Sequence, residues 1–252
     1  MRLAVTHTLP LVALLLAPLA ANAQTTTVDG PVALSVLTAL CDELVSARVA
    51  GLSLLAESRE VRSGRWEWMR PTLTAFAAQG VPALVWYARP DGSYYSVEKG
   101  LTDQNLKDRA YFQKLLGGVT TPVQELVVGK STGKQSLVVA VPVLVRNKLV
   151  GVLGASIYLE ALSERLATAL GNSPRLIFFA LAPDGRTAFH CQRQRLLVDP
   201  RTMGVPGLTA AVTRMLKEPT GSATYEFDGG VRDVLWQTSP VTGFRMVLGF
   251  IR

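Results

Sequence analysis

The stretch LVWYARPDGSYYSV at Leu84–Val97 has a counterpart in LIFFALAPDGRTAF at Leu176–Phe189. In both, an apolar run leads into Pro-Asp-Gly and then into a second run that contains aromatic residues. Proline presets φ and glycine accepts a positive φ, so each stretch predicts a hairpin. Two further matches, Pro142–Gly154 and Pro240–Gly249, follow in the same order. The repetition predicts two tandem domains of one type, and it favours sensing or binding over catalysis.

The periodicity around these stretches predicts an α+β fold. Apolar residues at three- and four-residue steps predict a long N-terminal helix, assigned to residues 24–64, with Asp29 as its N-cap. Each domain is predicted to hold an antiparallel sheet of about five strands with flanking helices. The predicted domains span residues 65–158 and 173–252, with a linking helix at 159–172. The predicted strands are 83–88, 94–98, 123–128, 135–144 and 148–157 in the first domain, and 175–181, 186–190, 222–227, 233–238 and 244–250 in the second.

The N-terminus has the pattern of a secretory signal peptide. Arg2 precedes an apolar run of about a dozen residues, and Ala21–Ala23 supplies a small-residue cleavage site before Gln24. The run is shorter than the roughly 20 residues that a membrane-spanning helix needs. We therefore expect cleavage between Ala23 and Gln24, and a periplasmic or secreted mature chain without a transmembrane helix.

Charge and composition limit the classes of molecule that are expected to bind this protein. The chain has a net charge of +7, and removal of residues 1–23, which contain Arg2 and no acidic residue, leaves +6. Basic residues are scattered, which indicates a solvated surface with a mild preference for anionic partners. No nucleic-acid motif accompanies them, so we expect no nucleic-acid partner.

The only two cysteines are Cys41 and Cys191. In an oxidising compartment an even pair indicates a disulfide, although two buried free thiols remain the alternative. With one histidine left after the signal peptide, the cysteines make a poor metal site, and neither a metal nor a cofactor is expected.

The sequence contains no strong pattern of catalytic residues. His190 is the one histidine downstream of the signal peptide, and it adjoins Cys191 in a predicted strand, where neighbours point to opposite faces. No nucleophile-elbow, zinc-protease or phosphate-loop spacing occurs. The sequence therefore predicts a protein that is not an enzyme.

Four short motifs resemble the extracellular double Cache (PAS-like) domain of bacterial chemoreceptors and sensor kinases. They are Asp108–Phe112, Thr132–Lys134, Ala140–Val143 and Val150–Ile157, in the family's order and spacing. The second Pro-Asp-Gly, Gly221–Ser222 and Thr242–Phe244 are similar to the family's membrane-proximal unit. The resemblance covers roughly residues 30–252. It implies that the first domain is the membrane-distal type, and it places Cys41 near the second unit, which adds weight to a Cys41–Cys191 disulfide.

The resemblance also implies a ligand site in the first domain. Arg109 and Tyr111 match positions that hold a ligand carboxylate in many members, and a guanidinium binds a carboxylate through two parallel hydrogen bonds. The predicted set of ligand-binding residues is Arg109, Tyr111, Phe112, Tyr95, Gln124 and Ser156. The alternative is that Arg109 caps its own loop and that the aromatic residues are core.

Two features depart from the family pattern. Ser156 stands where amino-acid-binding members carry an aspartate that pairs with the ligand ammonium group, and alternation does not decide whether Glu125 replaces it. We therefore expect a small organic acid, and not an α-amino acid. We also expect no flanking transmembrane helices and no output domain, unlike most members, and we therefore expect signalling through a membrane receptor or sensor kinase. Two alternatives stay open: a ligand-free interaction or dimerisation module, and a periplasmic enzyme of unknown chemistry.

Overall fold

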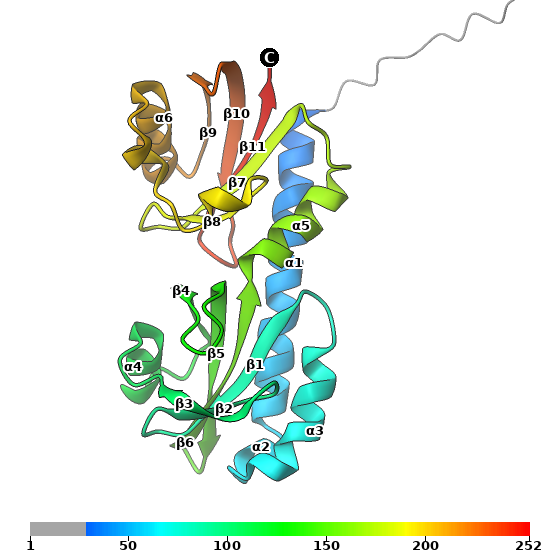
Figure 1. The fold of residues 1–252 in the computed structure, drawn as a ribbon, viewed down its shortest axis with the longest axis vertical. Helices are drawn as coiled ribbons and strands as arrows, with labels where there is room; N and C mark the ends of the chain where they lie inside the picture. The colour runs from blue at the N-terminus through cyan, green and yellow to red at the C-terminus, as the bar shows by residue number, and fades with distance from the viewer. Residues whose placement is uncertain (1–28) are drawn as a thin grey trace, which may run out of the picture.

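The structure, a computed structural model, describes residues 29–252. Two antiparallel sheets lie end to end along one long helix, α1 (Gly30–Ala56) (Figure 1). The predicted N-cap is confirmed, because the Asp29 carboxylate accepts a hydrogen bond from the Val32 N–H at 3.2 Å. The predicted signal peptide and its predicted cleavage site at Ala23 and Gln24 lie outside the described residues.

The long helix ends earlier than the sequence suggested. The helix ends at Ala56. Ser58 then caps a single-turn helix, α2 (Arg59–Arg62), because its side chain accepts a hydrogen bond from the Val61 N–H at 3.3 Å. A third helix, α3 (Trp66–Ala77), runs back beside α1. Between Ala56 and Trp66 the residues are mostly polar and Val61 is the one large apolar side chain, so the apolar periodicity stops with α1 although the predicted helix runs on to residue 64.

The first sheet has six strands in the order β3-β2-β1-β6-β5-β4. The strand β3 is not among the five predicted strands, because its sequence, GLTDQN, is mostly polar and its side chains lie at an exposed edge. One short helix, α4 (Ala110–Leu116), follows it. The strands are β1 (Ala83–Ala88), β2 (Ser93–Ser96), β3 (Gly100–Asn105), β4 (Val123–Val128), β5 (Gln135–Val145) and β6 (Lys148–Tyr158).

The second sheet has five strands in the order β8-β7-β11-β10-β9. It is joined to the first by α5 (Leu159–Ala169), which follows β6 directly, and it carries α6 (Pro206–Lys217). Two short 3-10 helices, η1 (Arg193–Arg195) and η2 (Pro200–Met203), lie between β8 and α6. The strands are β7 (Leu176–Leu181), β8 (Thr187–His190), β9 (Thr220–Phe227), β10 (Gly230–Thr238) and β11 (Arg245–Ile251).

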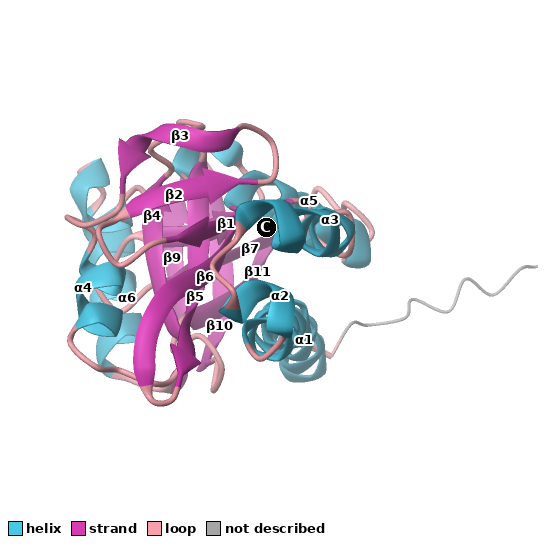
Figure 2. Cartoon of the chain, turned by 90° about the horizontal axis from the view of Figure 1, so that it is seen from below, coloured by secondary structure: helices cyan, strands magenta, loops and turns pink. Residues whose placement is uncertain are grey.

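The helices divide between the two faces of the sheets. Figure 2 shows α1, α2, α3 and α5 on one side and α4 and α6 on the other. One continuous core lies under the first group and includes residues from both sheets, whereas α4 and α6 each cover a separate core. The predicted α+β class, with a long N-terminal helix and two antiparallel sheets, is confirmed. Within residues 29–252, no helix combines the length and the apolar character needed to cross a bilayer.

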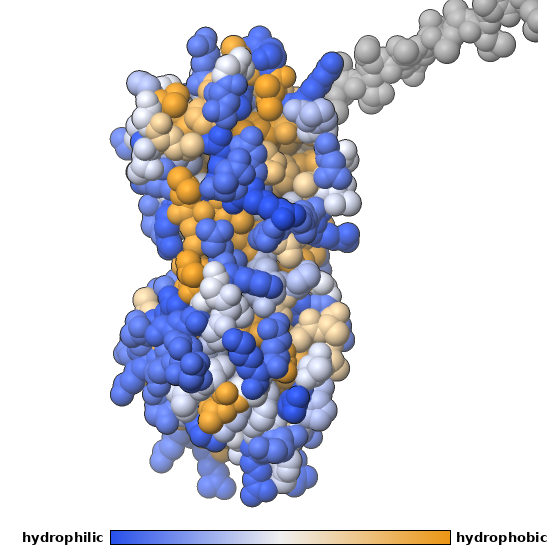
Figure 3. Space-filling view, in the orientation of Figure 1, coloured by the Kyte–Doolittle hydropathy of each residue, from blue (hydrophilic) through white to orange (hydrophobic). Residues whose placement is uncertain are grey.

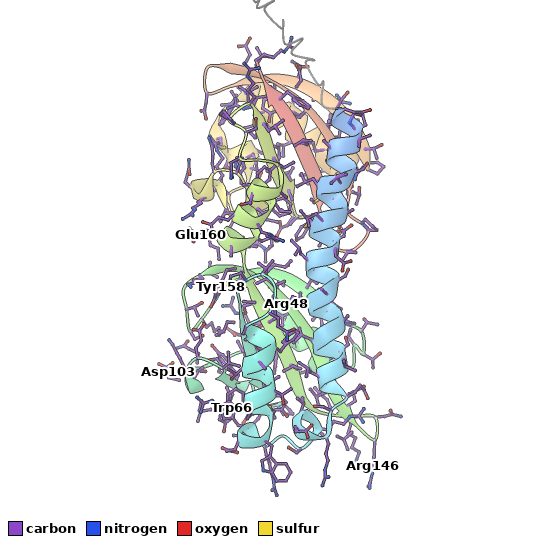
Figure 4. All side chains as sticks on the ribbon, turned by 90° about the vertical axis from the view of Figure 1, so that its right-hand side faces the viewer. Arg48, Trp66, Asp103, Arg146, Tyr158 and Glu160 are labelled. Carbon is purple, nitrogen blue, oxygen red and sulfur yellow. The ribbon has the colours of Figure 1, made fainter. Side chains whose placement is uncertain are left out.

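A buried arginine joins α1 to the end of α3. Arg48 is 4% exposed, and its guanidinium donates to Phe76 O at 2.9 Å, to Val81 O at 2.7 Å and to Gln79 O. Its charge also lies 4.9 Å from the centre of the Phe76 ring. Phe76 lies in the last turn of α3, where helix carbonyls lack partners and a positive charge is favourable, and Gln79 and Val81 lie in the segment between α3 and β1. Arg48 therefore fixes α3 against α1 (Figure 4).

We predict that Arg48→Met lowers the free energy of unfolding by about 3 kcal/mol, because it leaves buried carbonyls unpaired. Arg62→Met is the matched control: its ion pair with Glu57 is exposed to solvent and should contribute less than about 1 kcal/mol. Urea denaturation followed by circular dichroism measures both. Equal effects of the two substitutions would contradict this role of Arg48.

The predicted disulfide is wrong, because Cys41 and Cys191 are both free thiols. Cys41 is buried on α1, in the core that α1 shares with β10 and β11. Cys191 follows β8, which forms the far edge of the second sheet and packs against α5. The helix does pass the second sheet, as expected, but it packs on the central strand β11 and on β10, and not on the edge strand β8 that leads to Cys191.

Candidate functional site

The outer face of the first sheet, under α4, is built by strand alternation. On β1, Leu84, Trp86 and Ala88 point to the α4 side, while Val85 and Tyr87 point toward α1. Gly154 of β6 lies opposite Trp86, and a Cβ there would lie 2.2 Å from the indole. The absence of a side chain at Gly154 therefore allows the indole to lie flat against the sheet.

The indole is held by one hydrogen bond and two aromatic neighbours. Trp86 Nε1 donates to Ser156 Oγ at 3.1 Å. The Tyr111 ring lies 6.0 Å from the Trp86 ring at 42°, and the Tyr94 ring lies 6.3 Å away at 72°. All three aromatic side chains are at most 2% exposed, and burial raises the pKa of the Tyr111 phenol well above its ordinary value. The face is thus filled by protonated, largely apolar groups.

Helix α4 is fastened over this face at its N-terminus. Glu125 of β4 accepts the Tyr111 N–H at 2.7 Å, so a carboxylate on the sheet caps the helix. Arg109, the residue before the helix, donates from Nη2 to Val128 O at 2.7 Å. Each group uses one of its bonding positions here: a guanidinium has five N–H donors and a carboxylate has two acceptor oxygens. Both keep capacity to bind a further molecule.

Four of the six predicted site residues share this region: Arg109, Tyr111, Phe112 and Ser156. Phe112 is fully buried in the core under α4. The structure places the other two, Tyr95 and Gln124, away from this face. Tyr95 points to the opposite face of the sheet and stacks on Trp66, with ring centres 5.1 Å apart. Gln124 points toward the second domain, where its Nε2 donates to Val241 O at 3.2 Å.

Two residues of this region were missed by sequence reasoning. Trp86 lies in a run in which every residue is apolar, so alternation gave no sign of its face; the glycine opposite it on β6 was the available signal. Alternation in the sequence does not decide which face of β4 carries Glu125, and the structure places it on the α4 face with Val123 and Val127. The region therefore pairs a guanidinium with a carboxylate around an aromatic centre.

No protein-family model matches the chain. Its sequence is similar to the methyl-accepting chemotaxis protein PscA of Pseudomonas syringae pv. tomato, with 24% identity over 165 residues. That match covers 64% of this chain and 24% of PscA, so the chain spans only a small part of the length of this relative.

The fold is similar to solved extracellular sensor domains. The putative histidine kinase rpHK1S-Z16 has an extracellular domain that matches with a TM-score of 0.72 and 17% identity, over 87% of this chain and 91% of that domain. An extracellular ligand-binding receptor from Desulfohalobium retbaense matches with a TM-score of 0.71 and 14% identity, over 87% of this chain and 40% of the receptor. The ligand-binding domain of the Pseudomonas fluorescens chemoreceptor CtaA, solved with L-serine, matches with a TM-score of 0.66 and 15% identity, over 86% and 93%.

The chain has the double Cache fold. In this fold the first sheet with α4 is the first Cache unit, and the second sheet with α6 is the second. The Cache unit that carries Arg109 and Tyr111 is also the one whose outer face holds Trp86, Ser156 and Glu125.

We predict that the Trp86–Ser156 hydrogen bond appears as coupling in a double-mutant cycle. Ser156→Ala should cost about 1–2 kcal/mol of unfolding free energy, because it leaves a buried indole N–H unpaired. In a Trp86→Phe background the same substitution should cost almost nothing. Urea unfolding of the four proteins measures this coupling, and additive effects would contradict the contact.

Proposed function

We propose that this chain is the extracytoplasmic sensing module of a bacterial signalling system, and that it binds a small organic acid beneath α4. The observation that carries the proposal is the placement of Arg109 and Glu125 at the entrance to one aromatic face of a double Cache fold. The similar domains of known structure include ligand-binding domains of chemoreceptors, several of them solved with amino acids, which supports a small ligand with a carboxylate.

The chemistry of the proposed site supports a carboxylate ligand. Arg109 donates a single hydrogen bond to Val128 O, and no acidic residue among residues 29–252 forms an ion pair with it. A ligand carboxylate would accept two parallel hydrogen bonds from the guanidinium, which is stronger than one bond to a neutral carbonyl. Glu125 would accept from a hydroxyl or amino group of the same ligand. Because Glu125 supplies a carboxylate on this face, Ser156 in place of an aspartate is weaker evidence against an α-amino acid ligand.

Binding at this face requires a local rearrangement. Trp86, Tyr94 and Tyr111 fill the space between α4 and the sheet, so a ligand would displace the indole from Gly154 and Ser156. Helix α4 has only seven residues and is held by few bonds, which suits a movable cover. The proposed sensor therefore couples ligand binding to movement of Trp86 and α4.

A thermal-shift screen of residues 24–252 tests this function. Short carboxylates such as acetate, lactate and succinate are compared with alanine and aspartate, since a ligand that binds the native state raises the melting temperature. We predict that an acid stabilises the wild type and that Arg109→Gln abolishes the shift. Arg146→Gln is the matched control, because Arg146 is exposed in the β5–β6 turn at the far end of the first unit (Figure 4).

Glu125→Gln separates the ligand classes within that screen. It should weaken the shift only for acids that also carry a hydroxyl or amino group, because an acid without such a donor makes no bond to Glu125. A shift that survives Arg109→Gln would contradict the proposed site. The absence of any shift would contradict ligand binding.

A ligand-free interaction module is the second candidate, and the surface of α1 favours it. Val32, Val36 and Leu54 are 58%, 62% and 75% exposed on one side of this helix. Light scattering of the same protein measures its mass in solution. A dimer that is lost in Val36→Glu, together with no ligand response, would favour this candidate.

The features of His190 do not favour the enzyme alternative. Its Nδ1 accepts the Gln192 N–H at 2.8 Å, and its pKa is lowered to about 3, first by burial and then by Arg195 and Arg232. A base with that pKa is weak at neutral pH. Cys191 Sγ lies 3.5 Å from the same, already occupied nitrogen.

A further inference from the structure

A buried arginine in the second domain has no acidic partner. Arg232 lies on the same face of β10 as Val234 and Trp236, under the core that α6 covers, and it is 5% exposed. Among residues 29–252 its guanidinium makes one hydrogen bond, from Nη1 to Phe227 O, and its buried Nε has no partner. A buried charge without a counter-charge is unfavourable, so this environment is incomplete for a guanidinium.

The nearby acidic residues are already paired with other arginines. Asp228 accepts from Arg195, whose guanidinium lies 4.4 Å from the centre of the Phe227 ring, and Asp233 accepts from Arg252. Arg232 lies 4.8 Å from the centre of the same Phe227 ring. The positive charges of Arg195 and Arg232 add to burial in lowering the pKa of His190. The local charge around Arg232 is therefore positive and uncompensated.

Arg232 also lines an open cavity of about 270 Å³. The cavity lies where β8 stops at His190 and leaves the start of β7 without a neighbour on that side. Its polar lining comes from Asn172, Ser173, Cys191 and Gln192, and its apolar lining includes Leu170, Ile177 and Ile251. In the space-filling view, apolar patches gather over this second unit more than over the first (Figure 3). The cavity thus combines one unpaired cation with apolar walls.

We propose that this cavity is a second binding site, which takes a small organic anion whose carboxylate pairs with Arg232 and whose apolar part contacts Leu170, Ile177 and Ile251. The volume is at the lower end of the range for small-molecule sites, which suits a short-chain acid. The site is separate from the face under α4 and does not depend on Arg109. A ligand there would contact Ala167 of α5 and Leu170, the residue that follows this helix, and α5 connects the two sheets.

Cys191 provides a direct reporter, because it lines the cavity and is exposed, while Cys41 is 1% exposed and should not react. The experiment measures the rate of Cys191 alkylation by N-ethylmaleimide in residues 24–252 at mildly alkaline pH. The probes are butyrate, its neutral analogue butyramide, and inorganic phosphate, all at matched ionic strength. We expect butyrate to slow alkylation several-fold and in a saturable way, and butyramide and phosphate to have little effect.

Two variants test the assignment to this cavity. Arg232→Met should abolish protection by butyrate. Ser173→Phe fills the cavity and leaves Arg232 in place, and it should also abolish protection by butyrate. Agreement between the two variants shows that the loss in Arg232→Met is not caused by a folding defect. Arg109→Gln should keep the protection, so failure of this site and failure of the site under α4 are distinguishable.

The proposal is overturned if butyrate gives no protection, or if protection persists in Arg232→Met or in Ser173→Phe. Equal protection by butyramide would show that the negative charge of the ligand plays no part in binding. Equal protection by phosphate would remove the role of the apolar walls and would leave a general anion site.

Discussion

The burial of one face of α1 against both sheets is the constraint on which the rest of the structure depends. Leu37, Cys41, Val45 and Leu52 lie in a single apolar core that extends from the first sheet to the second. Burial of such side chains contributes about 1.5–3 kcal/mol each, which makes this contact the main source of stability between the domains. Because α1, α3 and α5 occupy one side, α4 and α6 are left on the other, and both outer faces are turned the same way. The architecture therefore presents two comparable faces, one in each Cache unit.

Those faces differ in what fills them. Under α4 an indole occupies the centre and its one polar group is paired with Ser156, so the face is closed and satisfied. In the second unit Arg232 is buried, partly unpaired and beside a cavity. A ligand for the first face binds only after Trp86 has left its contacts, that is, to the open state of this face. Because only a fraction of the molecules is in that state, the apparent affinity is the intrinsic affinity reduced by that fraction. A ligand for the second site completes an environment that already exists. The two proposals thus predict different behaviour: conformational change in the first unit and little change in the second.

Sequence reasoning recovered the parts of the fold that depend on repetition and periodicity. The two Pro-Asp-Gly turns, the long helix and ten of the strands have strong local signals, because turn geometry and alternation act over a few residues. Local signals do not specify which face a residue occupies in a fully buried strand, as for Trp86, or which partner a residue meets across a junction, as for Gln124. The disulfide prediction was wrong for a related reason: proximity of α1 to the second sheet does not specify which strands of that sheet the helix covers. β3 was missed because an exposed edge strand needs no apolar alternation.

The most direct test is ¹⁹F NMR of the chain labelled with 5-fluorotryptophan. The described residues hold four tryptophans, Trp66, Trp68, Trp86 and Trp236, and Trp86→Phe assigns the signal of the one under α4. The protein is titrated with the acid that stabilises it most in the thermal-shift screen. The account predicts that the Trp86 signal shifts in a saturable way, with the same affinity as stabilisation, while the Trp236 signal stays in place. Saturation of binding with no change at Trp86 would contradict the placement of the ligand beneath α4.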